Sequence, residues 1–292
     1  MQTNFFYRGK FWIISSVIII IVALIVLSKK IDKTVLKIEY VTVEKADDIV
    51  SIENNLVPPI LYSDVKLLNE LDMETRKKKF VEVILPTILI YHHQLGQERE
   101  KVKILHEKYR NEVAWSIEDS MFVQPVFQRY KTDEFEELID RMEPPPTSLA
   151  IAQAALESGW GSSRFFKEAN NVFGIWSFSE NDERIVANLS RDGKAIYLKK
   201  YSNLLGSVED YHLLLASSDH YSDFRDCIQR GNNVFELIWY LRTYSERRDQ
   251  YVIMLRNVIA ANQLTNYDEY ILDPAYYDYP DKKPDLFNLS KQ

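Results

Sequence analysis

The stretch that decides the fold is LAIAQAALESGWG, residues 149–161. Its first eight residues are small or aliphatic apart from Gln153, and this pattern predicts a short, mostly apolar, buried helix. Thr147 and Ser148 offer an N-cap directly after three prolines, which end the preceding helix. The helix ends near Glu157, so the carboxylate of Glu157 is expected to lie in an apolar environment.

The flanking segments predict a mainly α domain (α+β) with a small β-hairpin lobe. Upstream, apolar residues at helical spacing indicate a helix from about Met73, with a kink or a new start at Pro86, and a shorter helix before the prolines. Aromatic and β-branched residues alternate with polar ones between 174 and 201, which predicts a hairpin that turns at 191–194. Further helices are expected from about 207, at 234–244 and at 250–263.

Residues 11–28, FWIISSVIIIIVALIVLS, contain no charged residue. A helix of this length spans about 27 Å, near the hydrocarbon thickness of a bilayer. Arg8, Lys10, Lys29 and Lys30 flank it, and no cleavage site of small residues follows. These features favour one N-terminal transmembrane helix over a buried core helix or a cleaved signal peptide. Because both flanks are basic, they do not set its orientation.

The composition narrows the class of protein. The chain has 292 residues and a net charge of −7, which argues against sequence-independent binding to nucleic acid. The single cysteine, Cys227, excludes an intramolecular disulfide and a cysteine zinc site, and the adjacent His92 and His93 point to different faces of a helix. We therefore expect no metal and no cofactor, and the sequence identifies no protein partner.

The patterns divide the chain along its length. We expect a short N-terminal segment (1–10), a transmembrane anchor (11–28), a stalk (29–69), one folded domain (70–265) and an acidic, tyrosine-rich tail (266–292). The tail lacks apolar periodicity, so we expect it to be loosely attached or disordered.

Glu157 is the candidate that carries chemistry. Alanines and a leucine precede it and Trp160 follows, so its carboxyl group should be partly desolvated, which raises a carboxyl pKa because burial penalises the charged form. A raised pKa suits a general acid near neutral pH. A plainer interpretation is a glutamate that faces solvent or pairs with Arg164. Nearby glycines, which let the backbone approach a ligand, and aromatic rings, which stack on sugars, favour the catalytic interpretation.

AIAQAALESGWGSSRF, residues 150–165, and NNVFGIW, residues 170–176, carry a family resemblance. Together they resemble the signature of the bacterial Bax-type glucosaminidase domain, which is related to glycoside hydrolase family 73. The resemblance covers roughly residues 70–263. It implies a lysozyme-like fold, in which a mostly helical domain faces a small β-lobe across a cleft. It also implies that Glu157, the glutamate of LESG, is the general acid.

The resemblance implies further site residues. It places a tyrosine beside the acid, and Tyr244 and Tyr251 are the matching positions, although packing is the plainer role for each. The candidates for substrate binding carry a ring or a hydrogen-bonding group in or beside the two motifs, and they are Trp160, Arg164, Asn171, Phe173 and Trp176. Asn171 could instead cap a turn, and Arg164 could secure the loop after the helix.

Hydrolysis of a glycosidic bond usually requires a second carboxylate, about 5 Å from the acid for a nucleophile and about 6.5–9.5 Å for a base. The resemblance places this residue in the β-lobe, where Glu180, Asp182 and Glu183 are candidates. Glu183 fits best because it precedes a strand-like segment. The family's usual context around this residue is missing, and the substrate's own 2-acetamido group is the alternative base.

These features predict a peptidoglycan hydrolase anchored in the bacterial cytoplasmic membrane, an endo-β-N-acetylglucosaminidase that cleaves after N-acetylglucosamine. Its partners would be glycan strands and, through residues 11–28, the membrane. The domain would face the periplasm or the cell wall, because the substrate lies there. The alternatives are a lytic transglycosylase or muramidase on the same substrate and an inactive wall-binding scaffold.

Overall fold

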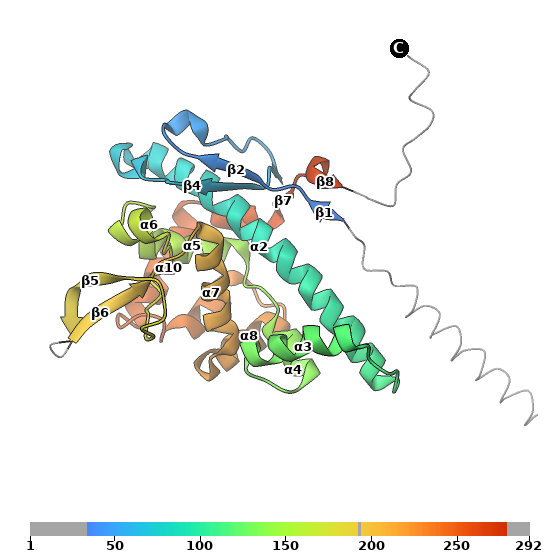
Figure 1. Cartoon of the computed structure of the whole chain (residues 1–292). Coiled ribbons are helices and arrows are strands. Elements are labelled where there is room, and N and C mark those ends of the chain that lie inside the picture. The colour runs from blue at the N-terminus through green and yellow to red at the C-terminus, as the bar shows by residue number, and fades with distance from the viewer. Residues whose placement is uncertain (1–33, 192–193, 279–292) are drawn as a thin grey trace, which may run out of the picture.

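The computed structural model describes residues 34–191 and 194–278. These residues form a mainly helical domain with small two-stranded sheets (Figure 1), which confirms the predicted mainly α fold. The apolar run at 11–28 lies outside the described residues. Within the ranges that the structure describes, no helix is both long enough and apolar enough to span a bilayer.

The helices of the described chain pack around the middle of one long helix, α2. The α-helices are α2 (Met73–Arg110), α3 (Ile117–Tyr130), α4 (Phe135–Arg141), α5 (Thr147–Ser158), α6 (Arg164–Ala169), α7 (Leu204–Ser217), α8 (Ser222–Gln229), α9 (Val234–Leu237) and α10 (Asp249–Ala261). The described chain also contains short 3-10 helices: η1 (Ala46–Asp48), η2 (Leu67–Glu70), η3 (Asp219–Tyr221), η4 (Ile238–Leu241), η5 (Leu264–Glu269) and η6 (Pro274–Tyr276). The helix predicted at 234–244 is therefore two short elements, α9 and η4.

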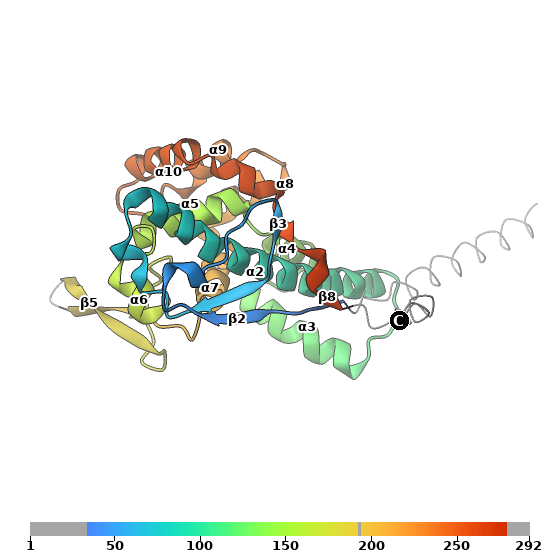
Figure 2. The same cartoon turned by 90° about the horizontal axis from the view of Figure 1, so that it is seen from above.

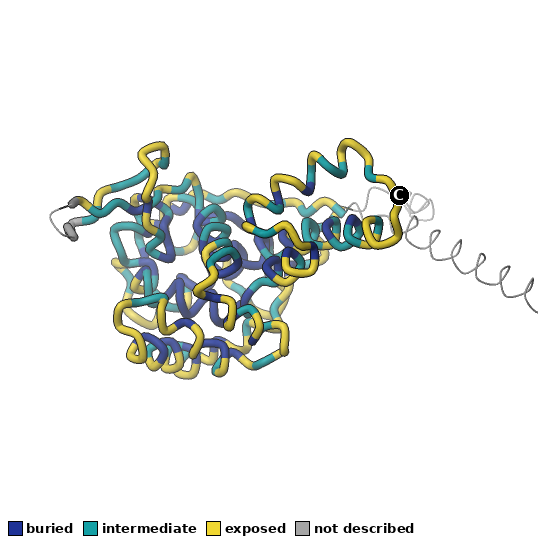
Figure 3. Tube along the Cα trace, turned by 90° about the horizontal axis from the view of Figure 1, so that it is seen from below, coloured by how far each residue is buried: buried dark blue, intermediate teal, exposed yellow. Residues whose placement is uncertain are grey.

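The strands form pairs on the outside of the helices. They are β1 (Val35–Leu36), β2 (Glu39–Thr42), β3 (Leu56–Val57), β4 (Ile60–Ser63), β5 (Arg184–Arg191), β6 (Lys194–Lys199), β7 (Ile271–Leu272) and β8 (Tyr277–Asp278). The pairs β1–β8 and β5–β6 are antiparallel, and the pairs β2–β4 and β3–β7 are parallel. The β5–β6 pair confirms the predicted hairpin. It projects from the helices, and at 184–187 and 195–199, where burial is described, its residues are largely intermediate or exposed (Figures 1 and 3).

Helix α2 organises the core. Asp72 caps it by accepting hydrogen bonds from the backbone N–H groups of Glu74 and Thr75. Every residue from Phe80 to Tyr91 is buried, because α5, α7 and β4 pack around this part of the helix. Figure 2 shows α2 and α5 between α10 on one side and β2 on the other.

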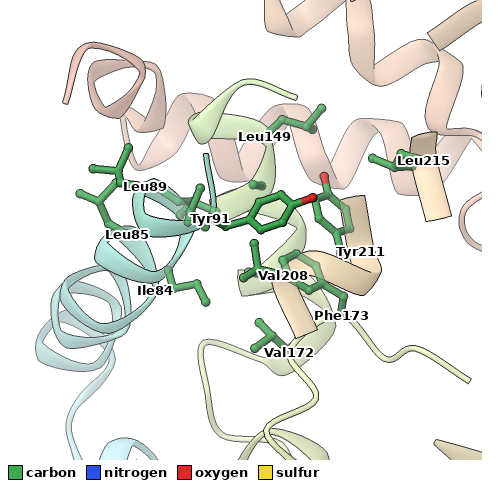
Figure 4. Packing of buried hydrophobic residues seen from close by; sticks show 14 of the residues in the cluster. Ile84, Leu85, Leu89, Tyr91, Leu149, Val172, Phe173, Val208, Tyr211 and Leu215 are labelled. Atoms are coloured by element: carbon green, nitrogen blue, oxygen red, sulfur yellow. The ribbon is translucent and has the colours of Figure 1, made fainter. Parts of the chain in front are cut away.

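Pro86 lies inside this enclosed part of α2. The sequence left open a kink or a new helix start at Pro86. The helix continues through Pro86, so a new start is excluded. Proline cannot donate a backbone hydrogen bond, so packing on all sides must offset that loss. Figure 4 shows Leu85 and Leu89 on one side of α2, and Leu149 of α5 and Val208 of α7 on the other.

The structure corrects the predicted stalk and tail. From residue 34 onward the stalk segment folds against the domain, with Val57 and Leu68 fully buried. Two of its strands pair with strands of the predicted tail, β3 with β7 and β1 with β8. Strands of two residues gain stability only from such pairing and burial, which local sequence patterns do not reveal. The tail residues 279–292 lie outside the described ranges.

The start of α5 also differs from the prediction. Thr147 and Ser148 lie inside the helix, and Pro146 occupies the N-cap without a side-chain hydrogen bond. Asp268 of η5 supplies the cap instead, because its carboxylate accepts hydrogen bonds from the backbone N–H and the hydroxyl of Ser148, both at 2.7 Å. A residue of the predicted tail therefore caps the helix that carries Glu157.

Candidate active site

Glu157 lies in the last turn of α5, and a fixed turn follows it. Gly159 and Trp160 have φ values of 59° and 57°, left-handed conformations that end the helix. Ser158 holds the turn, because its hydroxyl donates to the carbonyl of Ala154 at 2.6 Å and accepts from the N–H of Gly161 at 2.9 Å. A Cβ at Gly161 would lie 2.5 Å from Leu68 Cδ1. Gly159 therefore allows the chain to turn, and Gly161 allows it to pack closely against Leu68.

The carboxyl group of Glu157 is partly buried, and burial raises its pKa above the ordinary value. Two neighbours act in the opposite direction on this pKa: a hydrogen bond from Tyr251 and the positive charge of Arg247. Because the net shift is upward, burial outweighs both neighbours. Glu157 therefore stays protonated to a higher pH than an exposed glutamate.

A hydrogen-bonded chain of side chains leads to Glu157 from the core. The hydroxyl of Tyr211 donates to Gln153 Oε1 at 2.7 Å, and Gln153 Nε2 donates to the hydroxyl oxygen of Tyr251 at 2.9 Å. Tyr251 in turn donates its hydroxyl hydrogen to Glu157. All three bonds run in one direction, so Gln153 orients Tyr251 toward the acid.

Tyr244 stands beside this chain. Its ring stacks on that of Tyr251, with centroids 5.7 Å apart and planes 10° from parallel, and its hydroxyl donates to the carbonyl of Phe173 at 3.3 Å. Burial and the charge of Glu157 raise the pKa of both tyrosines. Both phenols therefore stay protonated and able to donate hydrogen bonds.

Two of the predicted substrate-binding residues are engaged inside the protein. The Asn171 amide donates to the carbonyls of Ile175 and Lys199, at 2.9 and 2.8 Å, and accepts from the N–H of Ile175. Phe173 is buried and stacks on Tyr211 at 4.0 Å. These contacts join the NNVFG loop to strand β6 and helix α7.

The remaining predicted substrate-binding residues, Trp160, Arg164 and Trp176, are partly buried or exposed. Trp160 packs edge-on against Phe80 of α2, with ring centroids 5.7 Å apart. Arg164 donates to the carbonyl of Val186 at 2.6 Å and so connects α6 to the hairpin. Trp176 is 40% exposed, and its ring lies 6.0 Å, centroid to centroid, from that of Phe178, which is 87% exposed.

The predicted second carboxylates lie in the hairpin lobe. Glu183 precedes β5 with an exposed side chain, and its carbonyl accepts from the N–H of Lys200. Asp182 accepts from the hydroxyl of Ser177 at 2.9 Å, and Glu180 is exposed. None of the three is among the groups that shift the pKa of Glu157. In the described ranges, no cluster of three or more His, Cys, Asp or Glu residues could hold a metal ion.

Sequence reasoning missed Gln153 and Tyr211 as parts of the site. A signal for Gln153 exists, because it is the single polar residue in LAIAQAAL and lies four residues before Glu157, on the same helix face. Tyr211 gives no such signal, since a tyrosine at an apolar helix position is ordinary packing.

The fold and the site define a helical domain whose central helices present a partly buried carboxyl group backed by tyrosines. Residues 132–276 match the family model Glucosaminidase, described as mannosyl-glycoprotein endo-beta-N-acetylglucosaminidase. The chain therefore carries a domain of the glucosaminidase family.

Two curated proteins are similar to the chain. Protein bax of Escherichia coli is 27% identical over 158 residues, which cover 51% of this chain and 54% of that protein. The exo-glucosaminidase LytG of Bacillus subtilis is 29% identical over 132 residues, which cover 42% and 46%. The chain thus spans about half the length of these relatives.

Solved structures also align with it. The catalytic domain of the autolysin Auto from Listeria monocytogenes is 22% identical and covers 55% of this chain and 96% of its own, with a TM-score of 0.36. A peptidoglycan hydrolase from Sphingomonas sp. A1 is 20% identical and covers 49% and 88%, also with a TM-score of 0.36.

Replacing Glu157 with Gln should stabilise the domain above the pH at which Glu157 ionises. The folded-state pKa is raised, so the stability that protonated Glu157 contributes is complete below the unfolded-state pKa of about 4.3 and is lost as pH rises through the folded-state pKa. Gln is neutral throughout, so the difference in unfolding midpoint between Glu157→Gln and wild type should grow from pH 4 to pH 8. Each kcal/mol corresponds to about 2–4 °C for a domain of this size.

The matched control is Glu107→Gln, which removes an exposed carboxylate from α2. It should follow the wild-type midpoint at every pH. A Glu157→Gln difference that stays constant between pH 4 and pH 8 would contradict the buried, raised-pKa carboxyl group.

Proposed function

We propose that this protein is a membrane-anchored glycoside hydrolase that cleaves the bond after N-acetylglucosamine in peptidoglycan, with Glu157 as general acid. The observation that carries the proposal is the partly buried carboxyl group of Glu157, whose pKa burial raises, within the LESG motif of a glucosaminidase-family domain. The names of the family and of LytG support glucosaminidase chemistry. The choice of peptidoglycan follows from the sequence resemblance to family 73.

In the proposed reaction Glu157 gives its proton to the leaving glycosidic oxygen. Burial keeps the carboxyl group protonated beforehand. Once the proton has left, the hydroxyl of Tyr251 and the charge of Arg247 stabilise the carboxylate that remains. Gln153 makes this possible, because it occupies the acceptor side of Tyr251 and leaves the phenol's hydrogen directed at Glu157.

Two sources of the second catalytic group remain within the proposal. Glu183 would serve from the hairpin lobe if substrate binding brings that lobe to the acid. The substrate's 2-acetamido group would serve if it does not. We assign substrate binding first to Trp176, since its exposed ring beside Phe178 offers a face for stacking on a sugar.

The membrane anchor is proposed from the charge-free run at residues 11–28. The orientation follows from the substrate, because glycan strands lie outside the cytoplasmic membrane. Residues 34–278 would then face the periplasm or the wall.

The central test is digestion of purified peptidoglycan by wild type and by Glu157→Gln, with mass spectrometry of the released fragments. Wild type should release fragments with reducing N-acetylglucosamine ends. Glu157→Gln keeps the size of the side chain but removes the proton, so the rate should fall by about 10²–10⁴-fold.

Glu107→Gln is the control and should keep the wild-type rate. Glu183→Gln separates the two sources of the second group: a comparable loss assigns Glu183, and a retained rate assigns the 2-acetamido group. Activity of Glu157→Gln near that of wild type would refute the mechanism. Fragments with 1,6-anhydro ends would identify a transglycosylase instead, and reducing N-acetylmuramic acid ends a muramidase.

Tyr251→Phe should move the basic limb of the pH profile of kcat/KM to higher pH. The hydrogen bond from Tyr251 lowers the pKa of Glu157, so its removal raises that pKa and keeps the acid protonated further into the alkaline range. The maximal rate should fall about tenfold or more, since one hydrogen bond to a charged group is lost. Tyr240→Phe, at an exposed tyrosine, should leave the profile unchanged. An unshifted limb in Tyr251→Phe would rule out this role.

The orientation is tested with reporters fused after Gln292. A reporter that is active only outside the cytoplasm, such as alkaline phosphatase, should be active in the fusion. A reporter that is active only inside, such as a cytoplasmic fluorescent protein, should be dark. The reverse pattern would place the domain on the wrong side for its proposed substrate.

A further inference from the structure

A cavity of about 440 Å³ lies on a part of the domain that the proposed reaction does not use. Its walls come from the first turns of α2, from the turn after α5, from Asn262 directly after α10 and from η5. The side chains that carry polar or aromatic groups into it are Glu74, Lys77, Lys78, Trp160, Asn262 and Tyr267. None of the residues that shift the pKa of Glu157 lines this cavity.

Lys77 is held in a fixed position in this wall. Its Nζ donates to Asn262 Oδ1 at 3.1 Å and lies 5.2 Å from the ring centroid of Trp160. Trp160 is itself fixed by its edge-on contact with Phe80. Three segments that are far apart in the sequence thus converge on one ammonium group.

The charge of Lys77 is not cancelled by these partners, because an amide oxygen and an indole ring are both neutral. Lys79 makes the contrast clear, since it lies 3.0 Å from the buried carboxylate of Glu82. Lys78, also in the cavity wall, lies 3.9 Å from the same carboxylate. Of the two lysines in the cavity wall, Lys77 is therefore the one placed to meet an anionic group of a ligand.

The rest of the wall suits a sugar. Tyr267 is half-buried and Trp160 partly buried, and aromatic side chains of this kind pack against the apolar faces of sugar rings. Asn262 and Glu74 add polar groups for hydroxyl and amide hydrogens. The volume lies within the range of about 300–1,000 Å³ that is usual for small-molecule sites.

We propose that this cavity is a second glycan-binding site, which takes a sugar unit that carries a carboxylate, with Lys77 as the residue that binds the carboxylate. That the ligand is a peptidoglycan glycan strand rests on the proposed function. In peptidoglycan the lactyl ether of N-acetylmuramic acid supplies such a carboxylate. Lys77 precedes the residues that match the family model, so part of the site comes from outside that match. A second contact with the same strand raises the effective concentration of substrate at Glu157.

The test uses the full-length chain with Glu157→Gln, so that the strand is not cut, and with 5-fluorotryptophan in place of tryptophan. The fluorine resonance of Trp160 reports on the cavity and that of Trp176 on the hairpin, each assigned with a Trp→Phe variant. The probe is a peptide-free tetrasaccharide of alternating N-acetylglucosamine and N-acetylmuramic acid. The tetrasaccharide should shift the Trp160 resonance to saturation, and chitotetraose, which lacks carboxylates, should bind there about tenfold more weakly.

Three variants in the same background test Lys77. Lys77→Met should weaken the Trp160 response about tenfold, while Lys77→Arg, which keeps the charge, should retain it. Lys103→Met removes a surface lysine further along α2 and should match the parent. Circular dichroism of each variant confirms that the domain is folded.

The inference is overturned if the tetrasaccharide leaves the Trp160 resonance unshifted, or if Lys77→Met binds as tightly as Lys103→Met. Its failure is distinct from failure of the proposed function. If Glu157→Gln loses digestion and the Trp160 resonance does not respond, the proposed hydrolase function stands and the proposed second site is rejected. If the Trp160 resonance responds in a way that depends on Lys77 but the wild-type protein digests no peptidoglycan, the proposed second site stands and the proposed hydrolase function is rejected.

Discussion

Between Phe80 and Tyr91 helix α2 has no side that faces water, and this constraint organises the domain. This stretch is mostly apolar, and a helix that is buried on every side is stable only where other elements cover it completely. Helix α5 covers one side, and its own residues from Thr147 to Ala155 are buried as a result. The tight turn after α5 follows from the same requirement, because Gly161 meets Leu68 and Phe80 at distances that leave no room for a side chain. The position of Glu157 is therefore set by packing against α2 before any catalytic group acts on it.

Two opposing effects meet at Glu157. Burial favours the protonated carboxyl group, and the hydrogen bond from Tyr251 and the charge of Arg247 favour the carboxylate. Because the pKa of Glu157 is raised overall, burial outweighs these two contributions without removing them. A group balanced in this way can hold a proton and also release it, as a general acid must. Tyr211 and Gln153 keep the balance in place, since they fix which way the phenol of Tyr251 donates.

Local patterns predicted the parts of this structure that depend on neighbours in sequence. The apolar helix before Glu157, the hairpin and most helices of the domain follow from periodicity and turn residues. The parts that depend on distant residues were missed. Asp268 caps α5 from 120 positions away, and Asn171 looked like a ligand-binding amide although its hydrogen bonds go to Ile175 and Lys199. In both cases the residue type indicated a hydrogen bond, but the partner could not be read from the chain.

The pairing of β1 with β8 and of β3 with β7 has a consequence for how the chain is made. Synthesis runs from the N-terminus, so Val35–Leu36 and Leu56–Val57 emerge more than 200 residues before their partners at Tyr277–Asp278 and Ile271–Leu272. Until then the early strands have exposed edges, and α5 has no carboxylate at its first turn. The pairs β1–β8 and β3–β7 can form only after nearly all of the domain has been translated. The native fold is therefore completed late in synthesis, when the C-terminal strands pair with the N-terminal ones.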